Sequence, residues 1–198
     1  MARKPEFDKD EKLLDAMTLF WQKGYANTAI SDLVETLKIN RFSLYNAYGD
    51  KQNLYYKALE TYLERISFPS VQVLTSANSG WPELKHFLHT FVQRQRSSHC
   101  GCFLQNALVE HAGQDDNVLS QGHRLFDFLL ARFSDCLGYA QSQGQIPDSV
   151  PAEQLATLLL CQMQGIRVLG KAKRLDDIDT ALTTLFLCIE GSNTNAKH

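Results

Sequence analysis

The chain has 198 residues, of which 44% are hydrophobic and 21% charged, a composition typical of a folded globular protein and unlike that of a disordered chain. Its formal net charge is −2, so overall charge gives no support for binding to a polyanion. Residues 1–67 carry ten Lys and Arg against ten Asp and Glu, and residues 68–198 carry ten against twelve, so neither part is basic.

The N-terminal segment MARKPEFDKDEK is polar and lacks the apolar run of a signal peptide. No stretch approaches the roughly 18–20 apolar residues that are needed to span a bilayer. We therefore expect a cytoplasmic protein with no membrane partner. An odd number of cysteines in a chain without an export signal favours free thiols over a disulfide framework; they are Cys100, Cys102, Cys136, Cys161 and Cys188.

Hydrophobic spacing predicts helices throughout the first third of the chain. Apolar residues from Leu13 to Trp21 recur every three or four positions, which predicts a helix over 8–23 that ends at Gly24. A short amphipathic helix is expected over 30–37, with Thr28 or Ser31 as its N-cap. A second short helix over 41–47 and a longer connecting helix over 51–66 follow; their expected N-caps are Asn40 and Asp50.

Helical patterns also fill the rest of the chain, after a seam at Phe68-Pro69, and no strand alternation of useful length interrupts them. The predicted fold is therefore all-α. The expected helices lie near residues 82–98, 103–112, 117–143, 151–170 and 176–190.

The two short helices over 30–37 and 41–47 are separated by a tight turn, which is the arrangement of a helix-turn-helix. The second of such helices reads base edges, so it needs an apolar anchor on one side and hydrogen-bonding groups on the other. Leu44 supplies the anchor. The side chains left for DNA are Arg41, Ser43, Tyr45 and Asn46, and Lys51 at the start of the next helix can hold a phosphate.

The run Ala29–Leu54, AISDLVETLKINRFSLYNAYGDKQNL, resembles the DNA-binding segment of TetR/AcrR-type regulators, most strongly over Asn40–Tyr45 and Tyr48–Lys51. Two positions depart from the family pattern. Lys38 stands in the turn, where the family usually has a glycine that tolerates positive φ. Phe42 replaces a small residue or proline, where its ring could contact a thymine methyl group or pack on the first helix.

This resemblance implies a homodimeric transcriptional regulator that is not an enzyme and needs no cofactor or metal. We expect a repressor rather than an activator, released from a double-stranded DNA operator by a small-molecule effector. The expected domains are a helix-turn-helix domain over 1–67 that includes the connecting helix, an effector-binding and dimerisation domain over 68–190, and a flexible tail over 191–198. The helices over 151–170 and 176–190 would form the dimer interface.

The candidate residues form two sets. The expected DNA contacts are Thr28, Lys38, Arg41, Phe42, Ser43, Tyr45, Asn46, Tyr48 and Lys51, with Tyr48 half-buried and its hydroxyl outward. The effector pocket of such a domain combines apolar walls with a few polar groups. Its expected residues are Tyr62, Phe87, Phe91, Phe103, Asn106, Glu110, Phe126 and Gln162.

Three alternatives remain open at this point. The same regulator could be switched by cysteine oxidation at Cys100 or Cys102, or the chain could be a helical module that binds protein rather than DNA. A thiol or metal enzyme would use those cysteines with His99 and His111. That pattern lacks the paired ligand spacing of a zinc site, and the sequence has no nucleophile elbow or glycine-rich phosphate loop.

Overall fold

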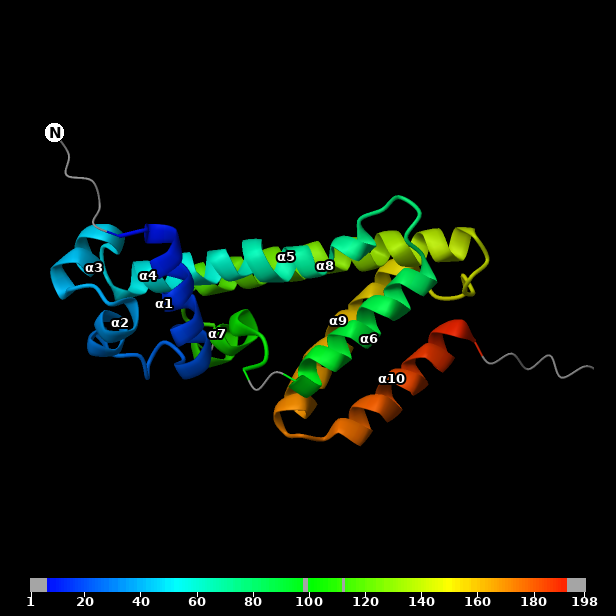
Figure 1. The fold of residues 1–198 in the computed structure, drawn as a ribbon. Coiled ribbons are helices and arrows are strands. Elements are labelled where there is room, and N and C mark those ends of the chain that lie inside the picture. Colours follow the sequence, from blue (N-terminus) through cyan, green and yellow to red (C-terminus); the bar gives the residue numbers. More distant parts are fainter. Residues whose placement is uncertain (1–6, 98–99, 112, 192–198) are drawn as a thin grey trace, which may run out of the picture. The chain divides into compact units, whose positions relative to one another are not determined.

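Helices make up the regular structure of the computed structural model, which describes residues 7–97, 100–111 and 113–191 (Figure 1). Over these ranges no strand is present, so the all-α prediction is confirmed. The elements are α1 (Lys9–Lys23), α2 (Ile30–Leu37), α3 (Arg41–Tyr48), α4 (Lys51–Tyr62), η1 (Leu63–Ser67), α5 (Phe68–Ser70), η2 (Gln72–Leu74), α6 (Trp81–Ser97), α7 (Phe103–His111), α8 (Asp116–Ser142), α9 (Ala152–Lys171) and α10 (Leu175–Glu190).

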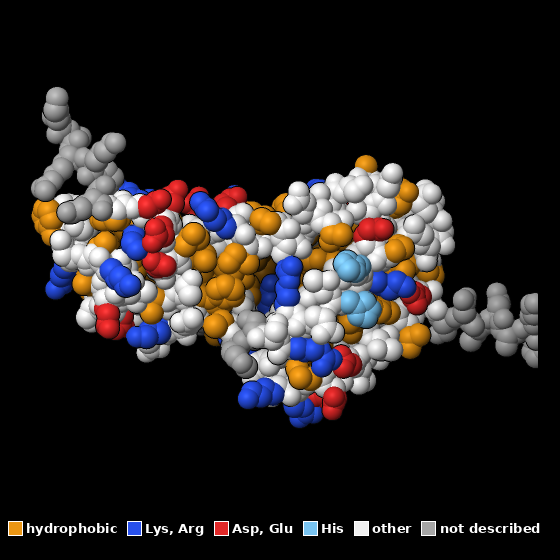
Figure 2. All heavy atoms as spheres, viewed as in Figure 1, with side chains coloured by type: hydrophobic (Ala, Val, Ile, Leu, Met, Phe, Trp, Pro, Cys, Tyr) orange, Lys and Arg blue, Asp and Glu red, His pale blue; other side chains and the backbone are white. Residues whose placement is uncertain are grey.

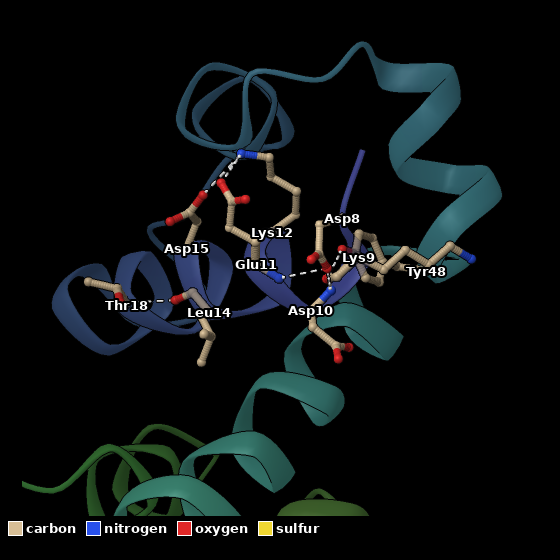
Figure 3. Close-up of polar contacts among 9 residues, drawn as sticks. All are labelled: Asp8, Lys9, Asp10, Glu11, Lys12, Leu14, Asp15, Thr18 and Tyr48. Atoms are coloured by element: carbon tan, nitrogen blue, oxygen red, sulfur yellow. Dashed lines mark hydrogen bonds and ion pairs between the residues drawn. The ribbon is translucent and has the colours of Figure 1, made fainter. Parts of the chain in front are cut away.

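The N-caps of the first helices explain why they begin where they do. The Asp8 carboxylate accepts the N–H of Asp10 at 2.9 Å (Figure 3), and the side chains of Asn40 and Asp50 accept the N–H groups three residues on, at 2.8 and 2.7 Å. The predicted cap of α2 was wrong. Ala29 holds the N-cap position, and its own N–H donates to the Asp32 carboxylate at 3.0 Å.

The chain does not leave the helical conformation at the predicted seam. Instead α4 continues into η1, a π-helical turn over Leu63–Ser67, and then into α5. A π-helical turn spaces its hydrogen bonds five residues apart, so it accommodates an extra residue without ending the helix. Helical backbone therefore reaches Ser70, beyond the expected end at residue 66, and Pro69 lies near the end of this continuous stretch.

The described residues divide into two compact units. Unit 1 contains those of 1–69 and 102–124, and unit 2 contains those of 70–101 and 125–191. The sequence predicted a contiguous domain over 1–67, whereas α7 and the first part of α8 also pack within unit 1. The reason is visible at Phe103, whose buried ring lies 5.6 Å from Tyr55 and 5.8 Å from Tyr62.

In unit 1, α1 packs along α4 and also contacts α2, while α3 packs against both α2 and α4. Phe20 of α1 and Tyr55 of α4 meet edge to face at 5.1 Å, and both rings are almost completely buried. Leu33, Leu37 and Leu44 are also fully buried. Leu44 is therefore the inward anchor of α3, as predicted.

In unit 2, α6, α9 and α10 pack on one another (Figure 1). Phe87 of α6 lies 5.7 Å from Phe133 of α8, and the Trp81 indole N–H donates to the Glu190 carboxylate at 2.7 Å. None of the helices over the described ranges is long and apolar enough to cross a bilayer.

Candidate nucleic-acid interface

The turn between α2 and α3 follows the expected backbone path without a glycine. Lys38 ends α2 with φ 53° and ψ 39°, in the left-handed region. Its side chain is exposed, so the strained residue also presents an ammonium group to solvent beside α3. Lys38 therefore adopts the positive φ that the family's usual glycine tolerates at this position.

The exposed side of α3 carries the side chains that sequence reasoning assigned to base reading. Arg41, Tyr45 and Asn46 are exposed, and the Phe42 ring is 75% exposed, which excludes the alternative that it packs on the first helix. The Arg41 guanidinium lies 5.6 Å from the Tyr45 ring centroid and donates to its hydroxyl at 3.4 Å. The helix therefore offers a cation, an amide and two aromatic rings on one side.

Ser43 contributes less side-chain surface to this face than its neighbours do. It is half-buried, and its backbone N–H is taken by the Asn40 cap. Its hydroxyl remains a candidate for phosphate contact at the N-terminal end of α3.

Tyr48 lies inside the unit, contrary to the expected outward hydroxyl. The residue is 5% exposed, and its hydroxyl donates to the Lys9 carbonyl at 2.8 Å (Figure 3). Burial is the largest cause that raises the pKa of Tyr48 to about 12, with the carboxylates of Asp10 and Asp8 adding to it. This tyrosine ties the end of α3 to the start of α1 and is not a DNA contact in this conformation.

Thr28 is the second residue that the structure removes from the predicted contacts. It is completely buried, and its hydroxyl donates to the Gly24 carbonyl at 2.6 Å. It closes the turn between α1 and α2 from inside, so it neither caps α2 nor reaches the surface.

Lys51 begins α4, where free backbone N–H groups and an ammonium can hold a phosphate together. In this conformation its Nζ atom lies 4.2 Å from the centroid of the Tyr25 ring. Desolvation is the largest cause that lowers the pKa of Lys51, while the charges of Glu110 and Asp32 oppose the decrease. A cation held on an aromatic face is positioned by that face.

Glu110, which was expected in the effector pocket, instead lies against the turn between α1 and α2. One carboxylate oxygen accepts the Tyr25 N–H at 2.9 Å and the other accepts the Ala26 N–H at 2.7 Å. Gly24 leaves room for it, because a Cβ at that position would lie 3.1 Å from the carboxylate. No sequence signal could have revealed this contact, since it joins residues 85 positions apart.

Asp115, just before α8, makes a second such link. Its carboxylate accepts the hydroxyl of Tyr56 on α4 at 2.8 Å and also caps α8 by accepting the Val118 N–H at 3.0 Å. Burial is the largest single effect on the pKa of Asp115 and raises it, but these bonds together outweigh burial and lower the pKa. Residues 102–124 are thus fixed within unit 1 by polar as well as apolar contacts.

The remaining predicted pocket residues fall in both units. Tyr62, Phe103, Asn106 and Glu110 belong to unit 1, and Phe87, Phe91, Phe126 and Gln162 belong to unit 2. Within unit 1 the rings of Tyr62 and Phe103 meet, and within unit 2 Phe91 lies against the Arg167 guanidinium.

The thiols and histidines give no metal cluster among the residues that can be placed. Cys102 and Cys136 are buried, Cys100 is half-buried, and Cys161 and Cys188 are exposed. His99 lies outside the described residues. Burial is also the main cause that raises the pKa of Cys136 to about 11.

The surface charge agrees with the balanced composition. On the face that Figure 2 presents, acidic and basic side chains are interspersed over the helices of unit 1 rather than gathered into a single basic patch. A nucleic-acid interface on this face would therefore depend on a few placed cations and hydrogen-bonding groups and not on a broad positive field.

Two family models match the chain: "Bacterial regulatory proteins, tetR family" over residues 13–57 and "Tetracyclin repressor-like, C-terminal domain" over residues 80–186. The HTH-type transcriptional repressor ComR of Escherichia coli K12 is 29% identical over 173 residues, covering 84% of this chain and 81% of ComR. The HTH-type transcriptional repressor DhaR of Mycobacterium sp. GP1 is 23% identical over 182 residues, with 91% of each chain covered.

Among solved structures, a cysteine mutant of the TetR family regulator CifR, complexed with 26-bp double-strand operator DNA, has a TM-score of 0.71 at 26% identity. The match covers 92% of this chain and 98% of CifR. The reduced form of E. coli NemR shares the fold, with a TM-score of 0.80 at 19% identity over 95% of this chain and all of NemR. The chain belongs to the TetR family of bacterial DNA-binding transcriptional regulators.

Proposed function

We propose that this regulator is a homodimeric repressor that binds a near-palindromic operator through α3 and leaves it when a small-molecule effector binds unit 2. The observation that carries the proposal is the exposed face of α3, formed by Arg41, Phe42, Tyr45 and Asn46 around the buried anchor Leu44. ComR and DhaR are named as repressors, which supports repression. The CifR structure contains operator DNA, which supports binding to an operator.

Each side chain of this face has a chemical role in the proposal. The Arg41 guanidinium can pair with two acceptors of guanine, and the Asn46 amide with adenine. The Phe42 ring can contact a thymine methyl group. Tyr45 and Ser43 hydroxyls would donate to phosphates, and so would the ammonium groups of Lys38 and Lys51 at the two ends of the interface.

The outer faces of α9 and α10 support the homodimer. No charged residue occurs from Gln154 to Ile166 on α9 or from Thr180 to Ile189 on α10. Leu158, Val168 and Leu187 are 47%, 60% and 62% exposed. The leucines and isoleucines of these helices were predicted to serve both the core and a partner, and most of them lie in the core. Those buried are Leu155, Leu159, Ile166, Ile178, Leu182, Leu185 and Ile189, and Leu169 is half-buried. Of those predicted, Leu158 is exposed enough to join the interface.

An uncharged helical face with large exposed apolar side chains is the expected composition of an obligate homodimer interface. A second copy of the chain would bring two α3 helices to successive major grooves, about 34–36 Å apart. Leu158→Glu should convert a dimer into monomers in sedimentation equilibrium. Val109→Glu, which changes a more exposed apolar residue of unit 1, should leave the mass unchanged.

Residues 102–124 supply the proposed route from effector to DNA. They fall within the span of the C-terminal family model, yet they pack in unit 1 through Glu110, Asp115 and the Arg124–Glu64 ion pair. Any effector-dependent shift of α7 would therefore act directly on the turn between α1 and α2. Such a shift changes a population only to the extent that the effector prefers one of the two conformations.

The test of the DNA-binding claim compares two arginine variants on fragments selected by the wild-type protein. Arg41→Ala should weaken binding by about 5- to 150-fold for each half-site, equivalent to the roughly 1–3 kcal/mol of one bidentate base contact per protomer. Arg94→Ala removes an exposed arginine of α6 and should leave the affinity unchanged. Equal affinity of both variants would remove α3 from the interface.

The effector claim is tested separately. Compounds that bind the purified protein are added to the preformed complex with DNA, and the retained DNA is measured. If DNA affinity stays constant in the presence of every compound that binds, the release mechanism is wrong while the DNA-binding claim stands.

A further inference from the structure

Arg167 of α9 is a buried cation in unit 2. It is 8% exposed and is the one charged residue between Gln154 and Gly170. Its guanidinium carbon lies 5.3 Å from the ring centroid of Phe91 on α6, and its Nη1 donates to the Gln164 side chain at 2.9 Å. The guanidinium therefore lies between α6 and α9 with one amide and one aromatic ring as neighbours.

This arginine has no carboxylate partner among the residues that the structure describes. Across the described ranges, no Asp or Glu oxygen lies within 4.0 Å of it, and the bond to Gln164 is its one side-chain hydrogen bond. Other arginines of unit 2 do have acids: Arg96 pairs with Asp179, and Arg132 with Asp135 at 3.0 Å. Of the arginines in the described ranges, the most buried one thus lacks, within those ranges, the counter-charge that burial of a cation normally requires.

Buried apolar residues lie one helical turn from Arg167 on α9 and one turn from its ring partner on α6. Phe91 and Met163 are 8% and 2% exposed, and Phe87, one turn before Phe91, is 5% exposed. Gln164 binds the arginine, and the half-buried Gln95 donates to the Phe91 carbonyl at 3.3 Å. The small residual exposure of both Arg167 and Phe91 means that neither group is sealed from solvent.

We infer that Arg167 binds the anionic group of an organic anion with an apolar body, such as an aromatic or aliphatic carboxylate, and that this is the chemical class of the effector. A guanidinium has five N–H donors in a planar arrangement that matches a carboxylate or phosphate, and at least four here are unused. Phe91 and Met163 offer the apolar body a place to pack. The inference rests on the proposed effector-controlled function and names the chemistry that unit 2 recognises.

The experiment measures binding to the full chain by calorimetry, without DNA, using matched pairs of probes. Benzoate and hexanoate carry the anion, benzamide and hexanamide replace it with a neutral group of similar shape, and inorganic phosphate lacks the apolar body. The wild-type protein should bind at least one carboxylate at least tenfold more tightly than its amide. Arg167→Gln should remove this preference, whereas Arg94→Gln, an exposed arginine on the facing helix, should retain it.

Arg167→Lys keeps the charge without the planar fork, so it should bind the carboxylate more weakly than the wild type but still prefer it to the amide. If Arg167→Gln does not fold, the wild-type probe pairs and Arg167→Lys decide the question. Binding of phosphate in place of the carboxylates would show an anion site without an apolar subsite, and it would overturn the inference that the effector has an apolar body. Equal binding of acid and amide by the wild type, or no anion binding at millimolar concentration, would overturn the inference.

The same probes separate this inference from the proposed function. A carboxylate that binds through Arg167 but does not release DNA would contradict effector release and leave the anion site standing. Release of DNA by neutral compounds alone would support effector release and contradict the inference that the effector is an anion.

Discussion

Glu110 on α7 holds the backbone of Tyr25 in the turn between α1 and α2, with its carboxylate accepting the Tyr25 N–H at 2.9 Å. The same carboxylate accepts the Ala26 N–H at 2.7 Å, so one side chain satisfies two consecutive backbone donors. The Tyr25 ring in turn supports the Lys51 ammonium at 4.2 Å. A single carboxylate therefore connects α7 to a residue proposed to contact DNA.

Replacement of Glu110 by alanine should lower the free energy of unfolding by about 1–3 kcal/mol, because two backbone N–H groups lose a charged acceptor. The effect is measured by urea denaturation of the full chain. Glu110→Gln keeps one acceptor oxygen and should lose less than the alanine variant.

Glu60→Ala is the matched control, since Glu60 is exposed on α4. If Glu110→Ala and Glu60→Ala unfold at the same urea concentration, the carboxylate contributes no stability. In the proposed function, Glu110→Ala should also weaken DNA binding while Glu60→Ala should not.

Much of unit 1 could be predicted from sequence because its signals are local. Asn40 and Asp50 cap helices within three residues of themselves, as predicted, and Leu44 follows from the period of α3. Asp8, expected as the first residue of its helix, is the N-cap one position earlier. The errors concern residues whose surroundings are set by distant segments. Tyr48 and Thr28 look like surface groups in sequence but are buried by the packing of α1.

The surroundings of Glu110 could not be predicted from the sequence either. Its sequence neighbours suggested a pocket, whereas its partners are backbone groups 84 and 85 residues away. The sequence also did not predict that residues 102–124 belong to unit 1. Their placement depends on a contact between distant segments, the packing of Phe103 against α4.

Lys38 stores backbone strain that glycine would relieve. Lys38→Gly should raise the free energy of unfolding by about 0.5–1 kcal/mol, since φ 53° is unfavourable for a residue with a Cβ. Lys38→Ala keeps the Cβ and should not gain stability. Both variants lose the ammonium group, so they should weaken DNA binding equally. Thermal unfolding checks the stabilities. If Lys38→Ala is also more stable than the wild type, the charge of Lys38 and not its φ lowers the stability of the folded state.

Tyr48 should make stability sensitive to alkaline pH. Its pKa is raised from 10.0 to about 12, so the folded state favours the protonated form. The resulting stabilisation is complete below pH 10 and is lost as pH rises from 10 to 12. Tyr48→Phe removes the hydrogen bond to Lys9, which should cost about 1 kcal/mol at neutral pH.

The measurement is the difference in unfolding free energy between wild type and Tyr48→Phe from pH 8 to 12. It should shrink above pH 10. A constant difference across this range would mean that the hydroxyl does not titrate as proposed. Taking a difference also cancels the contributions of Tyr55 and Tyr56, whose pKa values are raised by burial as well.

The salt dependence of DNA binding should reveal whether Lys51 contacts a phosphate. Each phosphate contact contributes about −0.9 to the slope of log affinity against log salt. Lys51→Ala should therefore reduce the steepness by about 1 per protomer. Lys57→Ala removes an exposed lysine of the same helix and should leave the slope unchanged; identical slopes for all three proteins would exclude a Lys51–phosphate contact.

The central claim is that α3 reads a symmetric operator, and selection of bound fragments from genomic DNA tests it most directly. The wild-type protein should enrich one family of sites with two inverted half-sites about 10 bp apart, centre to centre. Arg41→Ala should lose that enrichment and Arg94→Ala should keep it. Enrichment of no sequence, or of the same sequence by the Arg41→Ala variant, would contradict the claim.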